Sequence, residues 1–336
     1  MPRLFVPLLV LLLLPLLAGC QQQPAATAVA GGDYRLWQDA SIFTEVTSLL
    51  DSAAAGERLW VEMYEFGRPD LASEMIKARD RGADVRLIVD RTVPQSARTA
   101  DRLLAMGLPV RAYPVDDNRH QIDHVKLLIS AGEALVGGMN WGLHSSANHD
   151  YAFQTRRADV LARLRAIFEQ DWSLAGGHPA PLARSGGPVA QTAPGDEVRS
   201  LLVGAIRRAG NSIAAEVFVL TDPDVMVALA AAVRRSASVR LLLDPAQDSN
   251  LAPARILRAA GVGVRWYPVP QGAKLHAKAG LFDGRRLLVG SANWSQSGLS
   301  VNHELDLMSE DPLAASAFAA RFERDWAASG SGLRTG

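Results

Sequence analysis

Two short segments of the chain carry the residue types best suited to chemistry. His124 and Lys126 stand two residues apart in one segment, and His276 and Lys278 stand two apart in the other. On a strand, residues two apart point to the same face, so each pair places an imidazole beside an ammonium group. A lysine supplies a point charge for an anion such as a phosphate, and a histidine supplies a nucleophile or an acid. The pairs therefore predict a phosphate-handling site.

A hairpin follows each pair. An apolar run and a turn lead to a return segment that ends in Gly138 and Asn140 in the first copy, and in Ser291 and Asn293 in the second. A hairpin of this length brings the Asn back beside the His and Lys, where its amide and nearby backbone N–H groups add hydrogen-bond donors. Two of the four lysines in the whole chain fall in these segments, although the chain has 35 basic residues.

Other interpretations of these residues fit less well. A single histidine on a strand is usually structural, but that explanation does not account for the doubling. A metal site is disfavoured because an ammonium group two residues away is not a ligand and repels the ion. A serine hydrolase would need a G-x-S-x-G turn, which the sequence lacks. A non-enzymatic binding module remains an alternative, although both copies keep the His, the Lys and the Asn.

The elements that position these segments belong to an internal repeat. Residues 62–90 align without gaps on 216–244, with ten of 29 positions identical. The same offset of 154 aligns Phe168–Trp172 with Phe322–Trp326. Self-similarity of this kind predicts two copies of one domain. We place them at 33–175 and 196–330, with the Gly- and Pro-rich segment 176–195 as a linker.

Each copy has the pattern of an α/β domain. Apolar runs predict strands at 58–64 and 85–89 in the first copy, and at 211–218 and 239–243 in the second. Helical spacing over 70–81 and 224–235 begins after Asp70 and Asp224, which we expect to be N-caps. The hairpin and a final helix follow a third strand. We therefore predict two similar α/β domains, each a mixed β-sheet flanked by helices.

The N-terminus has the features of a targeting segment. Arg3 precedes an apolar run that is too short for a comfortable membrane span and ends in Leu17-Ala18-Gly19-Cys20. This ending resembles the lipobox of bacterial lipoproteins, in which the cysteine is acylated. The resemblance implies a signal peptide at 1–20 and lipidation of Cys20. Residues 21–32 have little to bury, so we expect them to form a flexible tether. We expect a lipid-anchored protein of the bacterial cell envelope, outside the cytoplasm.

The overall composition is that of a globular protein. The chain of 336 residues is 48% hydrophobic and 21% charged, which excludes a disordered protein or a disulfide-stapled mini-domain. Its 35 basic residues balance 35 acidic ones. Nucleic-acid binders usually have a basic excess, so this balance gives no support to that class.

The two hairpin segments resemble the paired HKD motifs of the phospholipase D (PLD) superfamily. The second copy matches in full, including Asp283. The first copy has Ser130 or Ala131 where Asp belongs and Gly138 where Ser belongs. In this family that Asp is mainly structural. The resemblance implies a metal-free and cofactor-free exchange at a phosphodiester, with a covalent phosphohistidine and one site between two pseudo-twofold domains of a single, monomeric chain.

The resemblance also assigns roles to residues. It makes His124 the nucleophile and His276 the acid, with the reverse assignment left open by the near-symmetry. It makes Asp150 and Glu304, about ten residues after each motif Asn, the carboxylates that orient the histidines. The remaining motif residues are implied to bind the phosphate: Lys126, Lys278, Asn140, Asn293, Gly138 and Ser291.

The substrate class is less determined than the chemistry. A membrane tether and the lack of an evident basic track favour phospholipid, with hydrolysis of head-group esters to phosphatidic acid. A metal-independent nuclease acting on DNA or RNA is an alternative, because Trp141 and Trp294 beside the motifs could stack on bases or pack in the core. A cardiolipin-synthase-like phosphatidyltransferase is a further alternative.

Overall fold

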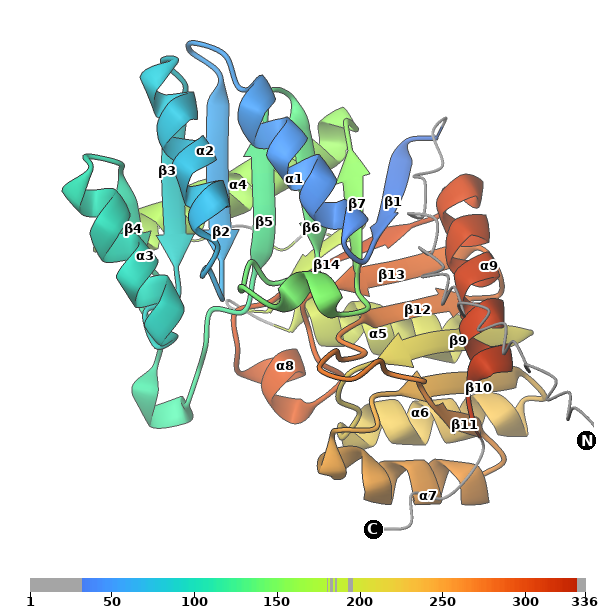
Figure 1. Cartoon of the computed structure of the whole chain (residues 1–336). Helices are drawn as coiled ribbons and strands as arrows, with labels where there is room; N and C mark the ends of the chain where they lie inside the picture. Colours follow the sequence, from blue (N-terminus) through green and yellow to red (C-terminus); the bar gives the residue numbers. More distant parts are fainter. Residues whose placement is uncertain (1–31, 180, 182–183, 185, 193–195, 331–336) are drawn as a thin grey trace, which may run out of the picture.

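The computed structural model describes residues 32–179, 181, 184, 186–192 and 196–330. The predicted signal peptide, Cys20 and most of the tether lie outside these residues. The chain forms two halves of closely similar architecture, which occupy the upper left and the lower right of Figure 1. Among the helices that the structure describes, none is both long and apolar enough to cross a membrane.

The first half consists of β1 (Tyr34–Gln38), α1 (Ser41–Ser52), β2 (Arg58–Met63), α2 (Pro69–Asp80), β3 (Asp84–Val89), α3 (Pro94–Ala105), β4 (Val110–Ala112), β5 (Lys126–Ser130), β6 (Glu133–Gly137), β7 (Tyr151–Thr155) and α4 (Ala158–Ala175). Short 3-10 turns lie at Asp117–Arg119 and Ser145–Ala147.

The second half consists of β8 (Val189–Gln191), α5 (Glu197–Arg208), β9 (Ser212–Val217), α6 (Pro223–Arg234), β10 (Ser238–Leu243), α7 (Leu251–Ala259), β11 (Gly263–Trp266), β12 (Lys278–Phe282), β13 (Arg286–Gly290), α8 (Gln296–Ser300), β14 (Leu305–Ser309) and α9 (Pro312–Ala328). A 3-10 turn at Asp248–Asn250 precedes α7.

Each half has a mixed sheet of seven strands. The orders are β1-β7-β6-β5-β2-β3-β4 and β8-β14-β13-β12-β9-β10-β11, which are equivalent strand for strand. Strands β2, β3 and β4 are parallel, whereas β5 runs antiparallel to β2, and the second sheet repeats this with β9 to β12. The predicted α/β fold with two mixed sheets is confirmed.

Details of the predicted elements need correction. Helices α2 and α6 begin at Pro69 and Pro223, so Asp70 and Asp224 lie in the first turn and are not N-caps. The cap of α6 is Asp222, whose carboxylate accepts hydrogen bonds from two backbone N–H groups, and Arg68 stands at the equivalent place in α2. Proline suits the first helical position because its missing N–H has no intrahelical partner there.

The predicted linker also contains structure. Within 176–195, the segment Val189–Gln191 forms β8 and pairs antiparallel with β14, as β1 does with β7 in the first half. Its three residues are buried, so edge pairing and packing outweigh the flexibility that the surrounding Gly and Pro suggest. Strands β1, β7 and β14, which the sequence pattern does not predict, complete the two sheets.

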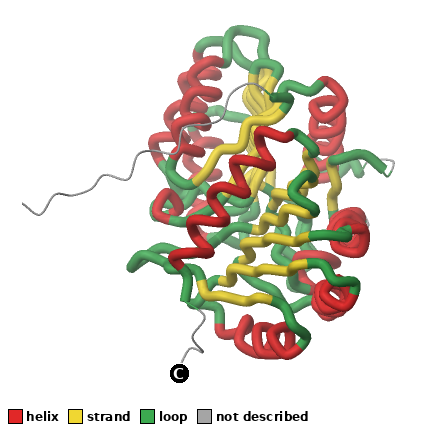
Figure 2. Tube along the Cα trace, turned by 90° about the vertical axis from the view of Figure 1, so that its right-hand side faces the viewer, coloured by secondary structure: helices red, strands yellow, loops and turns green. Residues whose placement is uncertain are grey.

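A shared hydrophobic core joins the two halves. It contains residues from both sheets and from α4 and α9, such as Trp60, Phe153, Phe168 and Phe318. The Trp60 and Phe168 rings stack with centroids 5.1 Å apart. Two further cores lie under α1 to α3 and under α5 to α7. Viewed from the right-hand side of Figure 1, α9 lies across strands of the sheets (Figure 2). This packing fixes the two motif segments relative to each other.

Candidate active site

The two motif segments occupy equivalent places in the two sheets. Lys126 is the first residue of β5 and Lys278 is the first residue of β12, with the histidines two residues earlier in each case. Strands β6 and β13 then end at Gly137 and Gly290, directly before the small residue and the Asn of each motif. The hairpins therefore place both motifs where the two halves meet.

Each histidine is hydrogen-bonded to a carboxylate of the opposite half. His124 Nδ1 lies 2.9 Å from Glu304 Oε2, and His276 Nδ1 lies 2.7 Å from Asp150 Oδ2. All four side chains are buried, the histidines being 5% and 7% exposed. A carboxylate that accepts from Nδ1–H fixes the ring and its tautomer and leaves Nε2 for chemistry. We call these two pairs the crossed dyads.

The two lysines are buried beside the histidines. The ammonium group of each lysine donates to the main-chain carbonyl of the histidine two residues before it. Lys278 Nζ also lies 3.0 Å and 3.1 Å from the two ring nitrogens of His276. Burial lowers the pKa of Lys126 to about 7 and that of Lys278 to about 8, while nearby carboxylates act in the opposite direction. A phosphate bound here would favour the charged form of both lysines.

The two dyads differ in their protonation. Burial acts to raise the pKa of Glu304, but the electrostatic and hydrogen-bond interactions with His124, together with Lys126, outweigh it and hold that pKa below its usual range. Burial raises the pKa of Asp150 to about 7, although Lys278 opposes the shift. Glu304 is therefore ionised at neutral pH, whereas Asp150 titrates near it.

The histidines are neutral at pH 7 before an anion binds. Burial lowers the pKa of His124 to about 4, partly offset by Glu304. Burial and then the charge of Lys278 lower the pKa of His276 well below its usual value. The sequence gives no direct sign of this burial, because both histidines follow charged or polar segments.

The two small motif residues match their carboxylates in size. Ser291 Oγ donates to Glu304 Oε2 at 2.5 Å, and Asn302 donates to Oε1 of the same carboxylate at 3.1 Å. Gly138 offers no hydroxyl, and a Cβ at this position would lie 2.3 Å from Asp150 Oδ1. The shorter carboxylate thus lies against the glycine, and the longer one lies within reach of the serine.

The two motif asparagines lie in different surroundings. Asn140 Nδ2 donates to Glu65 Oε2 at 3.2 Å. The Oδ1 atoms of both Asn140 and Asn293 are buried without a partner among the described residues. Glu65 was not singled out from the sequence, and its aligned residue in the second half is Val219.

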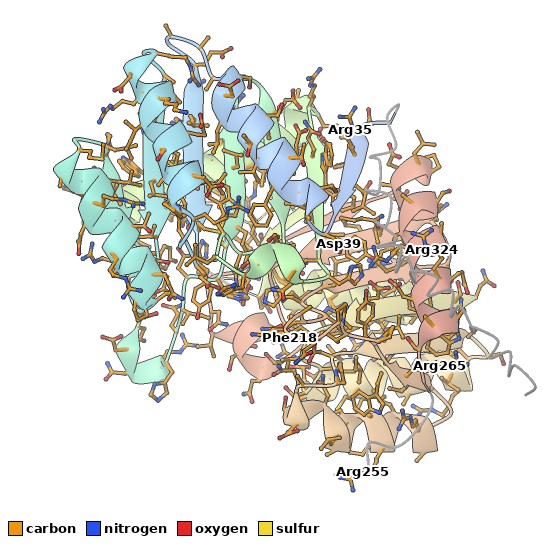
Figure 3. The ribbon with its side chains drawn as sticks, in the orientation of Figure 1. Arg35, Asp39, Phe218, Arg255, Arg265 and Arg324 are labelled. Carbon is orange, nitrogen blue, oxygen red and sulfur yellow. The ribbon has the colours of Figure 1, made fainter. Side chains whose placement is uncertain are left out.

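Two aromatic residues of the site were also missed. The Tyr64 ring contacts His124 with centroids 4.8 Å apart, and the Phe218 ring, labelled in Figure 3, contacts His276 at 4.9 Å. Each ring also lies near the motif lysine of its half, at 5.0 Å and 5.1 Å from Nζ. Their alignment at the repeat offset, directly after equivalent strands, is the signal that could have found them.

The motif Asp of the second half has a structural place. Asp283 accepts hydrogen bonds from the backbone N–H groups of Gly210 and Asn211 in the loop before β9, and from that of Ser212, the first residue of β9. In the first half, Ser130 Oγ instead donates to the carbonyl of Leu49 at 2.8 Å. The loss of this Asp from the first motif therefore alters a loop contact and leaves the dyads intact.

The tryptophans beside the motifs face the interior. Trp141 is 2% exposed and Trp294 is fully buried. Neither ring is available to stack on a base, so the sequence feature that favoured a nuclease is absent from the folded protein.

Two further groups of side chains have donors of the kind that bind metals. They are Glu62, Asp171 and His303, and His149, Glu216 and Asp325, all in the described part of the chain. Each group contains the histidine that directly precedes a dyad carboxylate in the sequence. The second contains its own cation, because Arg321 bonds Asp325 at 2.6 Å. His149 in that group is already hydrogen-bonded through both ring nitrogens. A metal ion therefore does not fit the second group.

The fold and the site together define a PLD-superfamily enzyme that cleaves or transfers phosphodiesters. The family described as "Cardiolipin synthase, PLD-like domain" matches the chain twice, over residues 46–172 and 202–326. The chain belongs to this family, and each match covers one half.

Curated relatives agree with this assignment. The chain is 30% identical to mitochondrial cardiolipin hydrolase of Xenopus laevis over 151 residues, which is 44% of this chain and 68% of that protein. It is 30% identical to the Homo sapiens protein of that name over 133 residues, 39% of this chain and 52% of the relative.

Phosphatidylserine synthase from Haemophilus influenzae has a similar fold, with a TM-score of 0.68 and 11% identity over 89% of this chain and 87% of that one. Polyphosphate kinase from Porphyromonas gingivalis matches with a TM-score of 0.64 and 14% identity, over 87% of this chain and 50% of its own. At these identities the two structures show the fold alone.

Proposed function

We propose that the protein hydrolyses head-group esters of phospholipids to phosphatidic acid through a covalent phosphohistidine. The observation that carries this proposal is the pair of crossed dyads, which offers two histidines and two lysines to one phosphate. Two histidines are what a double displacement at phosphorus requires, because one forms the covalent bond while the other transfers protons.

In the first step, His124 Nε2 attacks phosphorus. The bond from phosphorus to the head-group oxygen breaks, and His276 gives its Nε2 proton to that oxygen as the alcohol leaves. Lys126 and Lys278 bind the non-bridging oxygens of the phosphate. The negative charge of the bound substrate opposes the two ammonium charges, so His276 takes up its proton more readily in the complex.

In the second step, water attacks the phosphorus of the phosphohistidine. His276 now accepts a proton from the water, and the bond from phosphorus to His124 Nε2 breaks. The products are phosphatidic acid and the free enzyme. An alcohol in place of water would give phosphatidyl transfer by the same route.

The protonation of the dyads supports His124 as the nucleophile. A phosphohistidine carries positive charge on its ring, which an ionised carboxylate at Nδ1 stabilises. Glu304 is ionised and held by Ser291 and Asn302. Asp150, with a pKa of about 7, is the weaker anion and suits the histidine that only carries a proton.

A surface pocket of the first half supports a lipid substrate. A pocket of about 420 Å³ lies next to the loop after β2 and is lined by residues that include Arg98, Arg102 and Leu143. Both arginines are exposed, and Leu143 is 61% exposed. Cations beside an exposed apolar side chain suit a lipid surface, where the charges face phosphates and the leucine faces acyl chains. The names of the curated relatives, which are cardiolipin hydrolases, agree with this class.

The N-terminal sequence supports anchorage to a bacterial membrane through an acylated Cys20. Cys20→Ser expressed in a bacterium should leave the protein unprocessed or released from membranes. Fractionation together with the intact mass checks this, and an unchanged membrane fraction and mass would contradict lipidation.

The substrate class is tested with the full chain purified in detergent. The chain is incubated with phosphatidylcholine, cardiolipin or single-stranded DNA in excess chelator, and His124→Ala is the inactive control. We expect phosphatidic acid from at least one lipid. Adding an excess of alcohol shows whether transfer competes with hydrolysis. Cleavage of DNA without attack on lipid would overturn the proposal in favour of a nuclease.

A further inference from the structure

A histidine precedes each of the two dyad carboxylates. The segments are Asn148-His149-Asp150 and Asn302-His303-Glu304, and they align at the repeat offset of 154. Neither His149 nor His303 is part of an HKD motif, and both are buried. Their contacts lie largely in the half opposite to the sequence that carries them.

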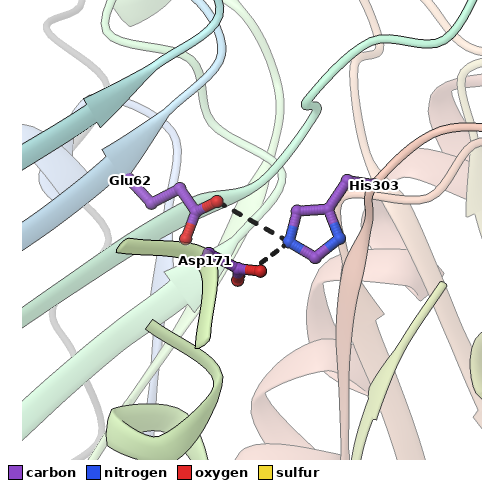
Figure 4. Close-up of side chains that lie close together, drawn as sticks. All are labelled: Glu62, Asp171 and His303. Carbon is purple, nitrogen blue, oxygen red and sulfur yellow. Dashed lines mark hydrogen bonds and ion pairs between the residues drawn. The ribbon is translucent and has the colours of Figure 1, made fainter. Parts of the chain in front are cut away.

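His303 inserts its ring among acidic residues of the first half. Its Nε2 lies 3.0 Å from Asp171 Oδ2 on α4 and 3.6 Å from Glu62 Oε1 on β2 (Figure 4). The ring also stacks on Tyr113, with centroids 4.6 Å apart and planes at 8°. All three polar side chains in Figure 4 are fully buried.

His149 makes the corresponding contacts in the second half. Its Nε2 lies 2.6 Å from Glu216 Oε2 on β9, and its ring stacks on Tyr267 at 5.0 Å with planes at 3°. Its Nδ1 lies 2.5 Å from Asp39, which Figure 3 labels where the two halves meet. Glu216 and Tyr267 align with Glu62 and Tyr113 at the repeat offset.

Backbone hydrogen bonds tie the same residues to the catalytic segments. The N–H of His124 donates to the carbonyl of His303 at 2.8 Å, and the N–H of His276 donates to the carbonyl of His149 at 2.8 Å. In return, the N–H groups of His303 and His149 donate to carbonyls two residues before each catalytic histidine. The backbone of His303 is therefore bonded directly to His124, the partner of Glu304. The backbone of His149 is likewise bonded to His276, the partner of Asp150.

We propose that His149 and His303 are positioning residues that insert into the opposite half and thereby hold Asp150 and Glu304 against the catalytic histidines. The inference rests on the proposed function only for its effect on turnover, because the geometry of the dyads can be measured without a substrate. The side chain of His149 or His303 fixes its segment in the opposite half, and the next residue, Asp150 or Glu304, then bonds the catalytic histidine.

The anchoring rings are charged at neutral pH. Burial opposes the charge, but Glu216 and Asp39 raise the pKa of His149 to about 10. Likewise, Asp171 and then Asp123 outweigh burial and raise the pKa of His303 to about 9. Because these folded-state values lie above the ordinary histidine value, the stabilisation is complete below it and is lost as pH rises through about 9 to 10.

The two anchors differ in the cations around them. The groups that face His303 are Glu62 on β2, Asp171 on α4, Asp123 before β5, Tyr113 after β4 and its own neighbour Glu304. Among the described residues, Glu62, Asp123 and Asp171 form no ion pair with Arg or Lys.

Around His149, by contrast, Arg321 bonds Asp39 and Asp325 at 2.7 Å and 2.6 Å. The remaining groups that face His149 are Glu216 on β9, Tyr151 on β7 and Tyr267 after β11. Loss of His303 therefore leaves three buried carboxylates without an ion-pair partner among the described residues. Loss of His149 leaves one, Glu216, because Arg321 still pairs with Asp39 and Asp325.

The test compares His303→Gln and His149→Gln with His178→Gln, the same change at an exposed histidine after α4. The full chain is labelled with ¹⁵N-histidine, and the Nδ1–H signals of His124 and His276 are assigned from their alanine variants. We expect His303→Gln to remove the hydrogen-bonded signal of His124 and to spare that of His276. His149→Gln should do the reverse, and His178→Gln should change neither signal.

Turnover provides the second measurement. With a nitrophenyl phosphodiester, kcat should fall about tenfold or more in His303→Gln and less in His149→Gln, with KM changed by less than about threefold. If His303→Gln fails to fold, Asp171→Asn replaces it. This variant keeps the ring but weakens its charge, so the His124 signal should disappear at a lower pH than in the wild type.

Unchanged dyad signals in folded variants would overturn the inference even if the enzyme is active. If the wild type shows no turnover on any phosphodiester, the proposed function fails instead. In that case the dyad signals still decide whether His149 and His303 position the carboxylates.

Discussion

The two halves of the site have the same backbone but differ in chemistry. His124 meets an ionised glutamate that accepts hydrogen bonds from a serine and an asparagine, whereas His276 meets an aspartate that titrates near pH 7 beside a glycine. The two dyads differ by one methylene group in the carboxylate, Glu304 against Asp150. They also differ by one hydroxymethyl group in the small residue beside it, Ser291 against Gly138. The duplication therefore supplied the geometry, and the small differences fit the proposed division of roles, in which one histidine is the nucleophile and the other the acid.

The largest expected effect comes from removing either catalytic histidine. His124→Ala and His276→Ala should each lower turnover by about 10² to 10⁴-fold, because both histidines act on one phosphate. On a substrate with a nitrophenolate leaving group, His276→Ala should partly recover, since that group needs little protonation. His124→Ala should not, because its nucleophile is gone.

Steady-state kinetics on natural and nitrophenyl substrates check this difference. Two independent half-sites would instead leave about half of the activity in each variant. Recovery of His124→Ala in place of His276→Ala would show that the roles are reversed.

The carboxylates should give the next largest effect, and the two should be unequal. Glu304→Gln removes an ionised partner and should lower kcat roughly 10- to 100-fold, the range for a hydrogen bond to a charged group. Asp150→Asn should cost less at pH 7, where Asp150 is already partly protonated.

The pH profile separates these variants further. Wild-type activity should fall as pH falls through about 7, because protonated Asp150 is a weaker acceptor for the Nδ1–H of His276 and no longer offers it a negative charge. Asp150→Asn should flatten this limb of the profile, and Glu304→Gln should leave it in place. If activity still falls below about pH 7 in Asp150→Asn, a group other than Asp150 controls this part of the pH profile.

Exchanging the small residues should give a moderate effect. Gly138→Ser places a Cβ 2.3 Å from Asp150 Oδ1 and should displace that carboxylate at a cost of about 1–3 kcal/mol. Ser291→Gly removes one hydrogen bond to Glu304 and should lower kcat by about tenfold or less.

A ¹⁵N-histidine spectrum shows whether each change acts on the dyad that it contacts. Gly138→Ser should alter only His276, and Ser291→Gly only His124. The opposite pattern would contradict the structural pairing.

Removal of metal ions should have the smallest effect. The ammonium groups of Lys126 and Lys278 lie beside both histidines and disfavour a cation there. Turnover in excess chelator should stay within about twofold of the control on a soluble phosphodiester. Activity that is lost in chelator and restored by a divalent ion would contradict this part of the account.

Much of the fold could be predicted because the repeat displays the same pattern twice. Helices α2 and α6 lie within one residue of their predicted positions, because both copies have helical apolar spacing and a Pro-Asp pair at the start of the helix. Strand β8 could not be predicted, because its three residues are too few to show a periodic pattern. They form a strand because they pair with β14.

The site could be predicted residue by residue but not as pairs. The motifs are visible in the sequence, and the resemblance to the PLD superfamily points to the acidic positions 150 and 304. The crossing of the dyads, by contrast, depends on how the two sheets pack together. The spacing of residues within one repeat does not indicate which residues of the other repeat they will contact. His149 and His303 were overlooked for the same reason, since their partners lie far away in the sequence.

The most direct test of the account is to locate the covalent intermediate. The wild-type chain is mixed with a phosphodiester substrate, stopped within one turnover in alkali to preserve phosphohistidine, and digested for peptide mass spectrometry. The account predicts a phosphoryl adduct on the peptide that contains His124, with none on His276 and none in His124→Ala. An adduct on His276, or turnover without any histidine adduct, would contradict it.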